Sequence, residues 1–204
     1  MTPAASLILA SASPARTKLL SDAGIAHSIR VSDVDEDAIT AAAGPLKPAE
    51  TALLLARAKA ESVAASAPNA LVVGCDSVFE FEGAPYGKPW EPNVARERWQ
   101  LMRGKSGVLH TGHWLINASP GETMALGEVN SAVVSFEDVS DAEIDAYVAT
   151  GEPLQVAGGF TIDGLAGAFI SGVEGDPHTV VGLSISTLRR LLAKSGVSIT
   201  DLWA

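Results

Sequence analysis

The fold of this chain is constrained most by one uninterrupted apolar run that leads into an aspartate. Residues Ala70 to Phe79 are almost entirely apolar, as in a central strand covered on both faces, and Asp76 falls near the end of the run. Ligands of open α/β sheets bind at the carboxyl ends of strands, and a carboxylate there is costly unless it is paired or metal-bound. The run therefore predicts an α/β sheet and makes Asp76 a candidate functional residue, with a paired structural carboxylate as the alternative.

A second strand near the N-terminus leads directly into a helix. Leu7 to Ala10 is a short apolar run, and Ser13 and Pro14 are typical of an N-cap and a first helical residue. A helix start presents unpaired N–H groups and positive charge, and here Ser11 precedes it while Arg16 lies in its first turn. The junction is a candidate phosphate cradle, with an ordinary capped helix as the alternative.

Hydrophobic periodicity and turn residues predict the remaining elements, all in one domain over residues 1–204. We expect a strand over Ile25 to Val31, helices over Pro48 to Ala67, Pro92 to Arg103 and from Ser140 to Gly151, an antiparallel hairpin of Val108 to Ala118 with Met124 to Phe136, and a closing helix over Ser186 to Lys194.

Four weaker signals lead to more ordinary expectations. The acidic run from Ser32 to Asp37 is typical of a solvated loop or a helix start. Ala38 to Lys47 is rich in Ala, Gly and Pro and predicts a mobile connection, and Gly127 predicts a β-bulge. Lys59 falls in the middle of a predicted helix, where a surface lysine is the ordinary interpretation.

Composition excludes several classes of protein. The net charge of −10 argues against nonspecific nucleic-acid binding, no apolar run reaches the length of a membrane span, and a single cysteine rules out an internal disulfide. Together with an N-terminus unlike a signal peptide, these features predict a cytoplasmic protein. Eleven of the fourteen Lys and Arg residues precede residue 106, so a polyanionic substrate would find its positive contacts there, with a metal as additional counter-ion.

Short motifs along nearly the whole chain, from Leu7 to Leu192, resemble the Maf family of nucleoside triphosphate pyrophosphatases. The motifs are Ser11 to Arg16 with Leu19-Leu20, Val34 to Glu36, Ala58 to Ala60, Gly74 to Ser77, Gly87 to Pro89, Tyr147 to Leu154, Ala157 to Phe160 and Val180 to Leu183. The resemblance implies a long mixed twisted sheet flanked by helices, as in the inosine triphosphate pyrophosphatases (the Maf/Ham fold), with a cleft between two lobes. It also implies a homodimer and a divalent cation, Mg²⁺ or Mn²⁺.

The resemblance further implies hydrolysis of nucleoside triphosphates to the monophosphate and pyrophosphate, and for some members a link to septum formation. The family's site residues match the phosphate-binding Ser11, Ser13 and Arg16, the acidic loop residue Glu36, the lysines Lys59 and Lys88, the catalytic Asp76, and Gln155. Gln155 matches the branch that prefers dTTP and UTP, whereas Ala15 stands where that branch has a second arginine, as in a branch acting on methylated GTP. The preferred base, canonical or modified, stays open.

Phosphoryl chemistry suggests how such residues would act. A metal held by Asp76 with Glu36 would bridge phosphate oxygens, or Asp76 would itself be the general base, while Arg16, Lys59 and Lys88 neutralise the phosphate chain. Two alternatives are a nucleotide-binding regulator of cell division with little turnover and a phosphatase that releases inorganic phosphate.

Overall fold

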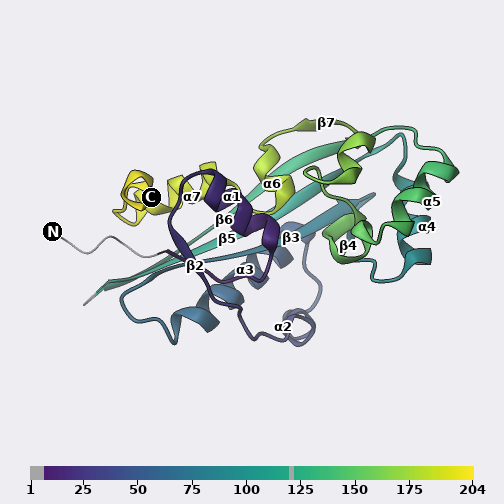
Figure 1. The fold of residues 1–204 in the computed structure, drawn as a ribbon. Helices are drawn as coiled ribbons and strands as arrows, with labels where there is room; N and C mark the ends of the chain where they lie inside the picture. The colour runs from purple at the N-terminus through teal and green to yellow at the C-terminus, as the bar shows by residue number, and fades with distance from the viewer. Residues whose placement is uncertain (1–6, 120–121) are drawn as a thin grey trace.

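The computed structural model describes residues 7–119 and 122–204, and within these ranges one seven-stranded mixed sheet carries helices on both faces (Figure 1). Its strand order is β2-β1-β3-β5-β6-β7, with β4 paired to β3 off this path. Strands β2, β1 and β3 are parallel, whereas β4, β5, β6 and β7 pair antiparallel to their neighbours. The predicted α/β class and mixed sheet are confirmed.

The elements in chain order are β1 (Leu7–Leu9), α1 (Pro14–Asp22), β2 (His27–Ile29), α2 (Glu36–Ala43), α3 (Pro48–Ala64), β3 (Leu71–Phe81), β4 (Ala84–Tyr86), α4 (Pro92–Met102), β5 (Ser106–Ser119), β6 (Glu122–Phe136) and α5 (Asp141–Ala149). They continue with the 3₁₀ turns η1 (Glu152–Gln155), η2 (Ala157–Gly159) and η3 (Leu165–Phe169), then β7 (Ile170–Glu174), α6 (Pro177–Val181), α7 (Ile185–Lys194) and η4 (Ile199–Leu202).

Strand β3 has a break along one of its edges. Strand β5 pairs with the other edge from Leu71 to Glu80 without interruption. On the broken edge, β1 pairs only as far as Val73, and β4 begins to pair at Phe79. The segment between these two pairings carries Asp76 and Ser77, so the break leaves an opening in the sheet edge at the predicted functional position.

The hydrophobic core is divided between two lobes at this break. The first lobe packs the start of β3 between α1 and α7 on one face, through Leu20 and Leu188, and α3 on the other face, through Val63. The second lobe packs the end of β3, with Phe79, against α4 and α5, with Trp99. Strands β5 and β6 run through both lobes, so the lobes share one sheet.

Helix α3 lies unusually close to the sheet because glycines lie beneath it. A Cβ atom at Gly74 on β3 would come within 2.2 Å of the Ala56 carbonyl oxygen, and one at Gly112 on β5 within 2.3 Å of the Ala52 carbonyl oxygen. Neither contact is possible for a larger residue, so these glycines set the distance between α3 and the strands.

Several local expectations are corrected by the structure. Residues 38–43 are not a mobile connection, because they belong to α2, with the Asp35 carboxylate accepting from the Ala38 N–H at 2.9 Å. The β5–β6 ladder passes Gly127 without a bulge, and the irregularity falls instead at Ser135/Phe136 against β7. Gly127 is required because the Trp114 ring covers it.

The predicted hairpin pairs as expected, and the Pro120-Gly121 part of its turn lies outside the described residues. No helix within residues 7–119 and 122–204 is long and apolar enough to cross a membrane.

Candidate active site

Lys59 joins two carboxylates that come from two other elements. Its Nζ lies 2.6 Å from Asp76 Oδ1 on β3 and 2.8 Å from Glu36 Oε1 at the start of α2. Lys59 is only 8% exposed, so the expectation of a surface lysine is wrong. The close approach of α3 to the strands carries Lys59 to the sheet, and the Asp35 cap places Glu36 in the first turn of α2. We call these three residues the Lys59 cluster.

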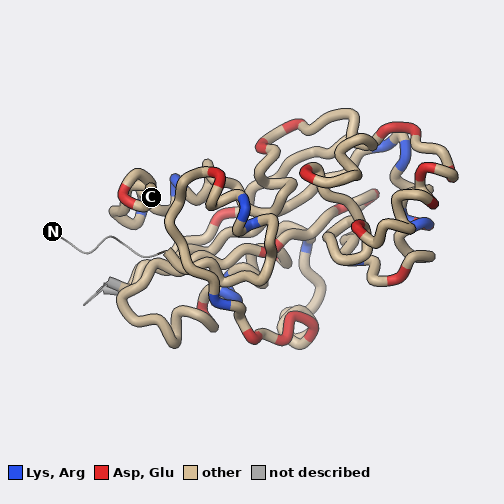
Figure 2. The backbone as a smooth tube through the Cα atoms, in the orientation of Figure 1, with Lys and Arg blue, Asp and Glu red and all other residues tan. Residues whose placement is uncertain are grey.

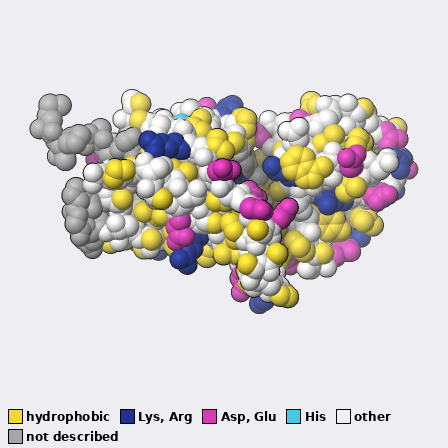
Figure 3. All heavy atoms as spheres, turned by 90° about the horizontal axis from the view of Figure 1, so that it is seen from below, with side chains coloured by type: hydrophobic (Ala, Val, Ile, Leu, Met, Phe, Trp, Pro, Cys, Tyr) yellow, Lys and Arg dark blue, Asp and Glu magenta, His cyan; other side chains and the backbone are white. Residues whose placement is uncertain are grey.

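The Lys59 cluster lies where the two lobes meet. Figure 2 shows the acidic start of α2 below the sheet, and Figure 3 shows Asp and Glu side chains gathered in the middle of the same face. Asp76 is 9% exposed, whereas half of the Glu36 side chain is open to solvent. Glu36 is therefore the solvent-facing member of the cluster and Asp76 the buried one.

Burial dominates the electrostatics of Asp76. Loss of hydration raises the pKa of its carboxyl group above the ordinary value, and the positive charges of Lys59 and Arg16 only partly oppose this. A carboxylate with a raised pKa in a cleft is suited to accept a proton near neutral pH. Its Oδ1 accepts from Lys59, and no hydrogen bond to Oδ2 occurs among the described residues.

Arg16 is a buried cation held by neutral oxygens. Its Nε donates to the Gly182 carbonyl at 2.7 Å, Nη1 to Ser11 Oγ at 3.1 Å and Nη2 to Ser77 Oγ at 3.1 Å. The residue is 9% exposed, and no ion pair among the described residues includes it. A buried charge without an ion-pair partner is costly, and a bound anion would compensate it.

The start of α1 forms as the sequence predicts. Ser13 is the N-cap, with its Oγ accepting from the Arg16 N–H at 3.5 Å, and Pro14 is the first helical residue. Ser11 Oγ accepts from the Ser13 N–H at 3.2 Å as well as from the Arg16 side chain. Ser11, Ser13 and Arg16 are therefore brought together, and anion binding by them stays a prediction.

Lys88 and Gln155 lie apart from the Lys59 cluster, both exposed, on the second lobe. Lys88 Nζ lies 5.0 Å above the Trp90 ring, and the Trp90 N–H donates to the Leu154 carbonyl at 3.0 Å, which ties the Lys88 loop to the Gln155 segment. Because β4 runs antiparallel to β3, the loop that follows Tyr86 continues along β3 in the direction from Phe79 to Asp76. No hydrogen bond or ion pair among the described residues joins Lys88 or Gln155 to the Lys59 cluster.

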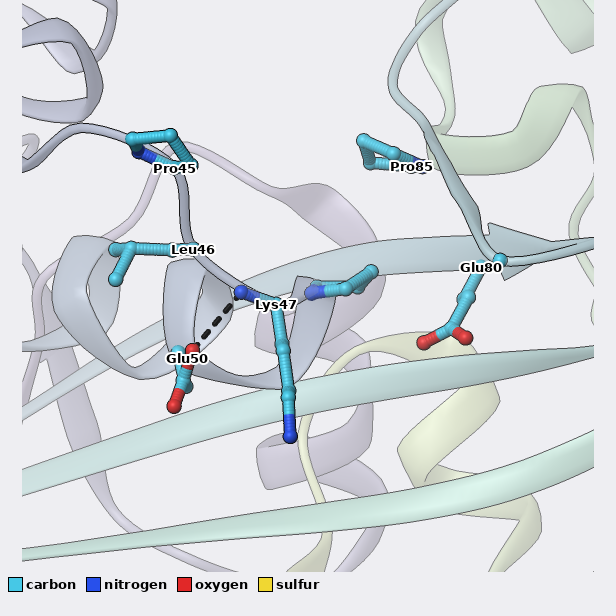
Figure 4. Close-up of a pocket in the computed structure, with 8 residues that line it drawn as sticks. Pro45, Leu46, Lys47, Glu50, Glu80 and Pro85 are labelled. Carbon is cyan, nitrogen blue, oxygen red and sulfur yellow. Dashed lines mark hydrogen bonds between the residues drawn. The ribbon is translucent and has the colours of Figure 1, made fainter.

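A groove of about 570 Å³ lies between the start of α3 and the turn that joins β3 to β4 (Figure 4). Pro45, Leu46 and Pro48 form the first-lobe wall, and Pro85 faces them from the second lobe, while the Lys47 and Glu80 side chains point to the same side between them. The groove begins at the N-terminus of α3, and Lys59 lies about 16 Å further along that helix. None of the predicted site residues lines it, so the groove is distinct from the Lys59 cluster.

The sequence analysis assigned no role to Gly182, which accepts from Arg16 directly, or to Thr111, which contacts the Arg16 partner Ser77. Thr111 on β5 contacts Ser77 Oγ at 2.9 Å, and the Gly182 carbonyl lies at the end of α6. Gly182 occurs in a family motif, so the sequence marks the position without showing what it does. No sequence signal marks Thr111, because its position opposite Ser77 depends on the register between two strands far apart in the chain.

The acidic residues of the cluster fit a divalent cation that arrives with a substrate. Glu36 and Asp76 approach the Lys59 ammonium from two sides, so both carboxylates converge on one small volume. No group of three His, Cys, Asp or Glu side chains suited to a metal occurs among residues 7–119 and 122–204. Mg²⁺ commonly takes one or two carboxylates and completes its shell with substrate phosphates and water, which matches this donor set.

Fold and site together define an α/β protein with buried charged residues at a break in its sheet. The family model for Maf-like protein matches residues 6–195, so the chain belongs to the Maf family and the resemblance found in the sequence is confirmed. Proteins named nucleoside triphosphate pyrophosphatase are similar over nearly full length. That of Leifsonia xyli is 54% identical over 97% of this chain and 96% of that protein, and that of Streptomyces coelicolor 50% over 99% and 96%.

A more distant similarity connects the chain to a solved structure. The Staphylococcus aureus Ham1 protein aligns at 14% identity with a TM-score of 0.45, covering 93% of this chain and 99% of that chain.

Proposed function

We propose that this protein hydrolyses nucleoside triphosphates to the nucleoside monophosphate and pyrophosphate. The Maf relatives named nucleoside triphosphate pyrophosphatase support this reaction class. The observation that carries the proposal is Arg16, a buried cation with neutral partners, close enough to the Lys59 cluster for its charge to act on Asp76. A triphosphate bound there would supply the missing negative charge.

The chain's own residues account for the main steps. Arg16, with the positive N-terminal end of α1, holds the phosphate chain, and Lys59 offsets charge that develops near Asp76. Water attacks a phosphorus of the chain, the bond between the α and β phosphoryl groups breaks, and pyrophosphate leaves. Asp76 accepts the proton that the water loses.

In the alternative to Asp76 as the base, Asp76 and Glu36 would hold the divalent cation, Mg²⁺ or Mn²⁺. Such an ion neutralises phosphate oxygens and lowers the pKa of bound water. Lys59, which bridges both carboxylates, would then donate to substrate oxygens.

Further aspects of the function rest on the family resemblance. Lys88 and Gln155 are proposed to contact the substrate from the second lobe, with dTTP, UTP or modified nucleotides as candidates. The homodimer, a cytoplasmic location and a link to septum formation remain predictions.

A turnover screen tests the proposal. Purified protein with Mg²⁺ or Mn²⁺ is offered canonical and modified nucleoside triphosphates, and pyrophosphate is measured separately from inorganic phosphate. We expect pyrophosphate release that is abolished in Asp76→Asn and retained in Asp145→Asn, an exposed aspartate on α5 paired with Arg96. Release of inorganic phosphate alone would favour a phosphatase, and binding without turnover would favour a regulator.

A further inference from the structure

The Arg16 guanidinium is fixed by three segments that are far apart in the sequence. Three of its five N–H groups donate to Ser11 Oγ, Ser77 Oγ and the Gly182 carbonyl, which leaves two N–H groups for a ligand. Where those two point depends on how firmly the three acceptors are held. Ser11 Oγ also accepts from the Ser13 backbone N–H, whereas the hydrogen bonds of Ser77 Oγ are to side chains, so the Ser77 hydroxyl is the acceptor least constrained by backbone.

A chain of hydrogen bonds fixes that rotation. Thr111 Oγ1 lies 2.8 Å from the Thr179 carbonyl, which can only accept, so the single Thr111 proton is used there. In the 2.9 Å contact between Ser77 and Thr111, Ser77 must therefore donate. The lone pairs of Ser77 Oγ are then turned toward Arg16, which can only donate. The Thr179 carbonyl at one end of this hydrogen-bond series and the Arg16 guanidinium at the other therefore fix both hydroxyl protons.

The far end of this chain is anchored in rigid structure. Thr111 is fully buried and stands directly opposite Ser77 in the long β3–β5 ladder. The Thr179 carbonyl also accepts from the Gly182 N–H at 3.1 Å, within the same segment that holds Arg16 Nε. Without the Thr111 hydroxyl, the Ser77 proton loses its acceptor and can turn toward the guanidinium.

We propose that Thr111 is a positioning residue for Arg16: through Ser77 it orients the guanidinium for the phosphate chain of the substrate. The inference rests on the proposed function in one respect, namely that the anion bound by Arg16 is a triphosphate. Thr111 does not touch the substrate, and its effect falls on binding of the phosphates.

The test compares two buried threonines. Thr111→Val removes the relay hydroxyl at nearly constant volume. Thr179→Val removes an equally buried hydroxyl whose Oγ1 has no hydrogen-bond partner among the described residues, and it keeps the backbone carbonyl. Thr111→Ser restores the hydroxyl without the methyl group. The affinity for inorganic triphosphate with Mg²⁺ is measured by calorimetry, alongside KM and kcat for the best nucleotide.

We expect Thr111→Val to weaken inorganic triphosphate binding and raise KM about tenfold, with kcat changed by less than about threefold, because Arg16 contributes to ground state and transition state alike. Thr111→Ser should return both constants to within about twofold of the wild type, and Thr179→Val should stay in that range.

Equal losses in Thr111→Val and Thr179→Val would reduce Thr111 to a packing role and overturn the inference, as would unchanged binding in Thr111→Val or failure of Thr111→Ser to restore it. Wild-type protein that binds inorganic triphosphate but cleaves no nucleotide would refute the proposed function alone, because the variants can still be compared by calorimetry. Wild-type protein that binds neither inorganic triphosphate nor a nucleotide would refute both the proposed function and the role of Thr111.

Discussion

Gly74→Ala is the substitution that connects the packing of this fold most directly to its site. The new Cβ would lie 2.2 Å from the Ala56 carbonyl oxygen and 2.7 Å from the Ala60 nitrogen, both in the backbone of α3. Ordinary contact begins at 3.4 Å, so α3 has to move away from β3 by about 1 Å. Overpacking of this kind costs about 1–3 kcal/mol of unfolding free energy.

The same displacement reaches the Lys59 cluster. Lys59 lies one residue before Ala60, so its ammonium moves with the helix, and the 2.6 Å contact with Asp76 lengthens beyond hydrogen-bond range. Misplacement by about 1 Å lowers turnover by about 100-fold. Urea unfolding gives the stability change, and steady-state pyrophosphate release gives the activity.

Gly172→Ala is the matched control. Gly172 lies on β7, and a Cβ there would meet no atom within 4 Å, so we expect a stability change below about 0.5 kcal/mol and normal turnover. A Gly74→Ala protein that unfolds like the wild type and keeps full turnover would refute the packing argument. Lost stability with full turnover would show that the cluster does not depend on the position of α3.

Three further outcomes are expected. Lys59→Met should lower kcat by about 10²–10³-fold in the pyrophosphate assay, because an electrostatic donor is lost and two carboxylates face each other; near-normal kcat would contradict this. Because burial raises the pKa of Asp76, the acid limb of kcat/KM should have its midpoint above pH 3.8, and a plateau continuing below that pH would argue against Asp76 as the base. Burial lowers the pKa of His113 to about 4, so its contribution to stability is present above pH 6.5 and lost as pH falls through 4, by about 3 kcal/mol. Urea unfolding across this range should show the loss in the wild type and a flatter profile in His113→Leu.

The sequence predicted those parts of the fold that have strong local signals. The apolar run of β3, the Ser13-Pro14 helix start and the Ser140 capping box all appear where expected. The acidic run left the start of α2 open as a solvated loop or a helix start, and the rest of the helix was missed because none of its residues is buried against the core. Composition alone suggested a flexible segment, whereas the Asp35 cap and alanine propensity were enough to form a helix.

Within the site, the family resemblance selected residues that periodicity would have dismissed. Lys59 in an alanine-rich helix looked like a surface residue, and only the glycines beneath α3 bring it to Asp76. The support of Arg16 by Thr111 could not be predicted, because the contact depends on the register of distant strands and on the placement of α6. Such contacts are fixed by tertiary structure and leave no pattern in the local sequence.

The sharing of β3 between the lobes has a mechanical consequence. Both cores hold the same strand, so the lobes cannot lean toward each other about a flexible linker, and closure must twist the strands themselves. Asp76 and Ser77 lie between the cores, at the pivot of such a motion, where displacement is smallest. Lys88 lies on a loop of the second lobe away from this pivot, so it would move furthest when the strands twist. Asp76, the proposed base, would thus stay in place while the Lys88 loop sets how tightly a bound substrate is enclosed.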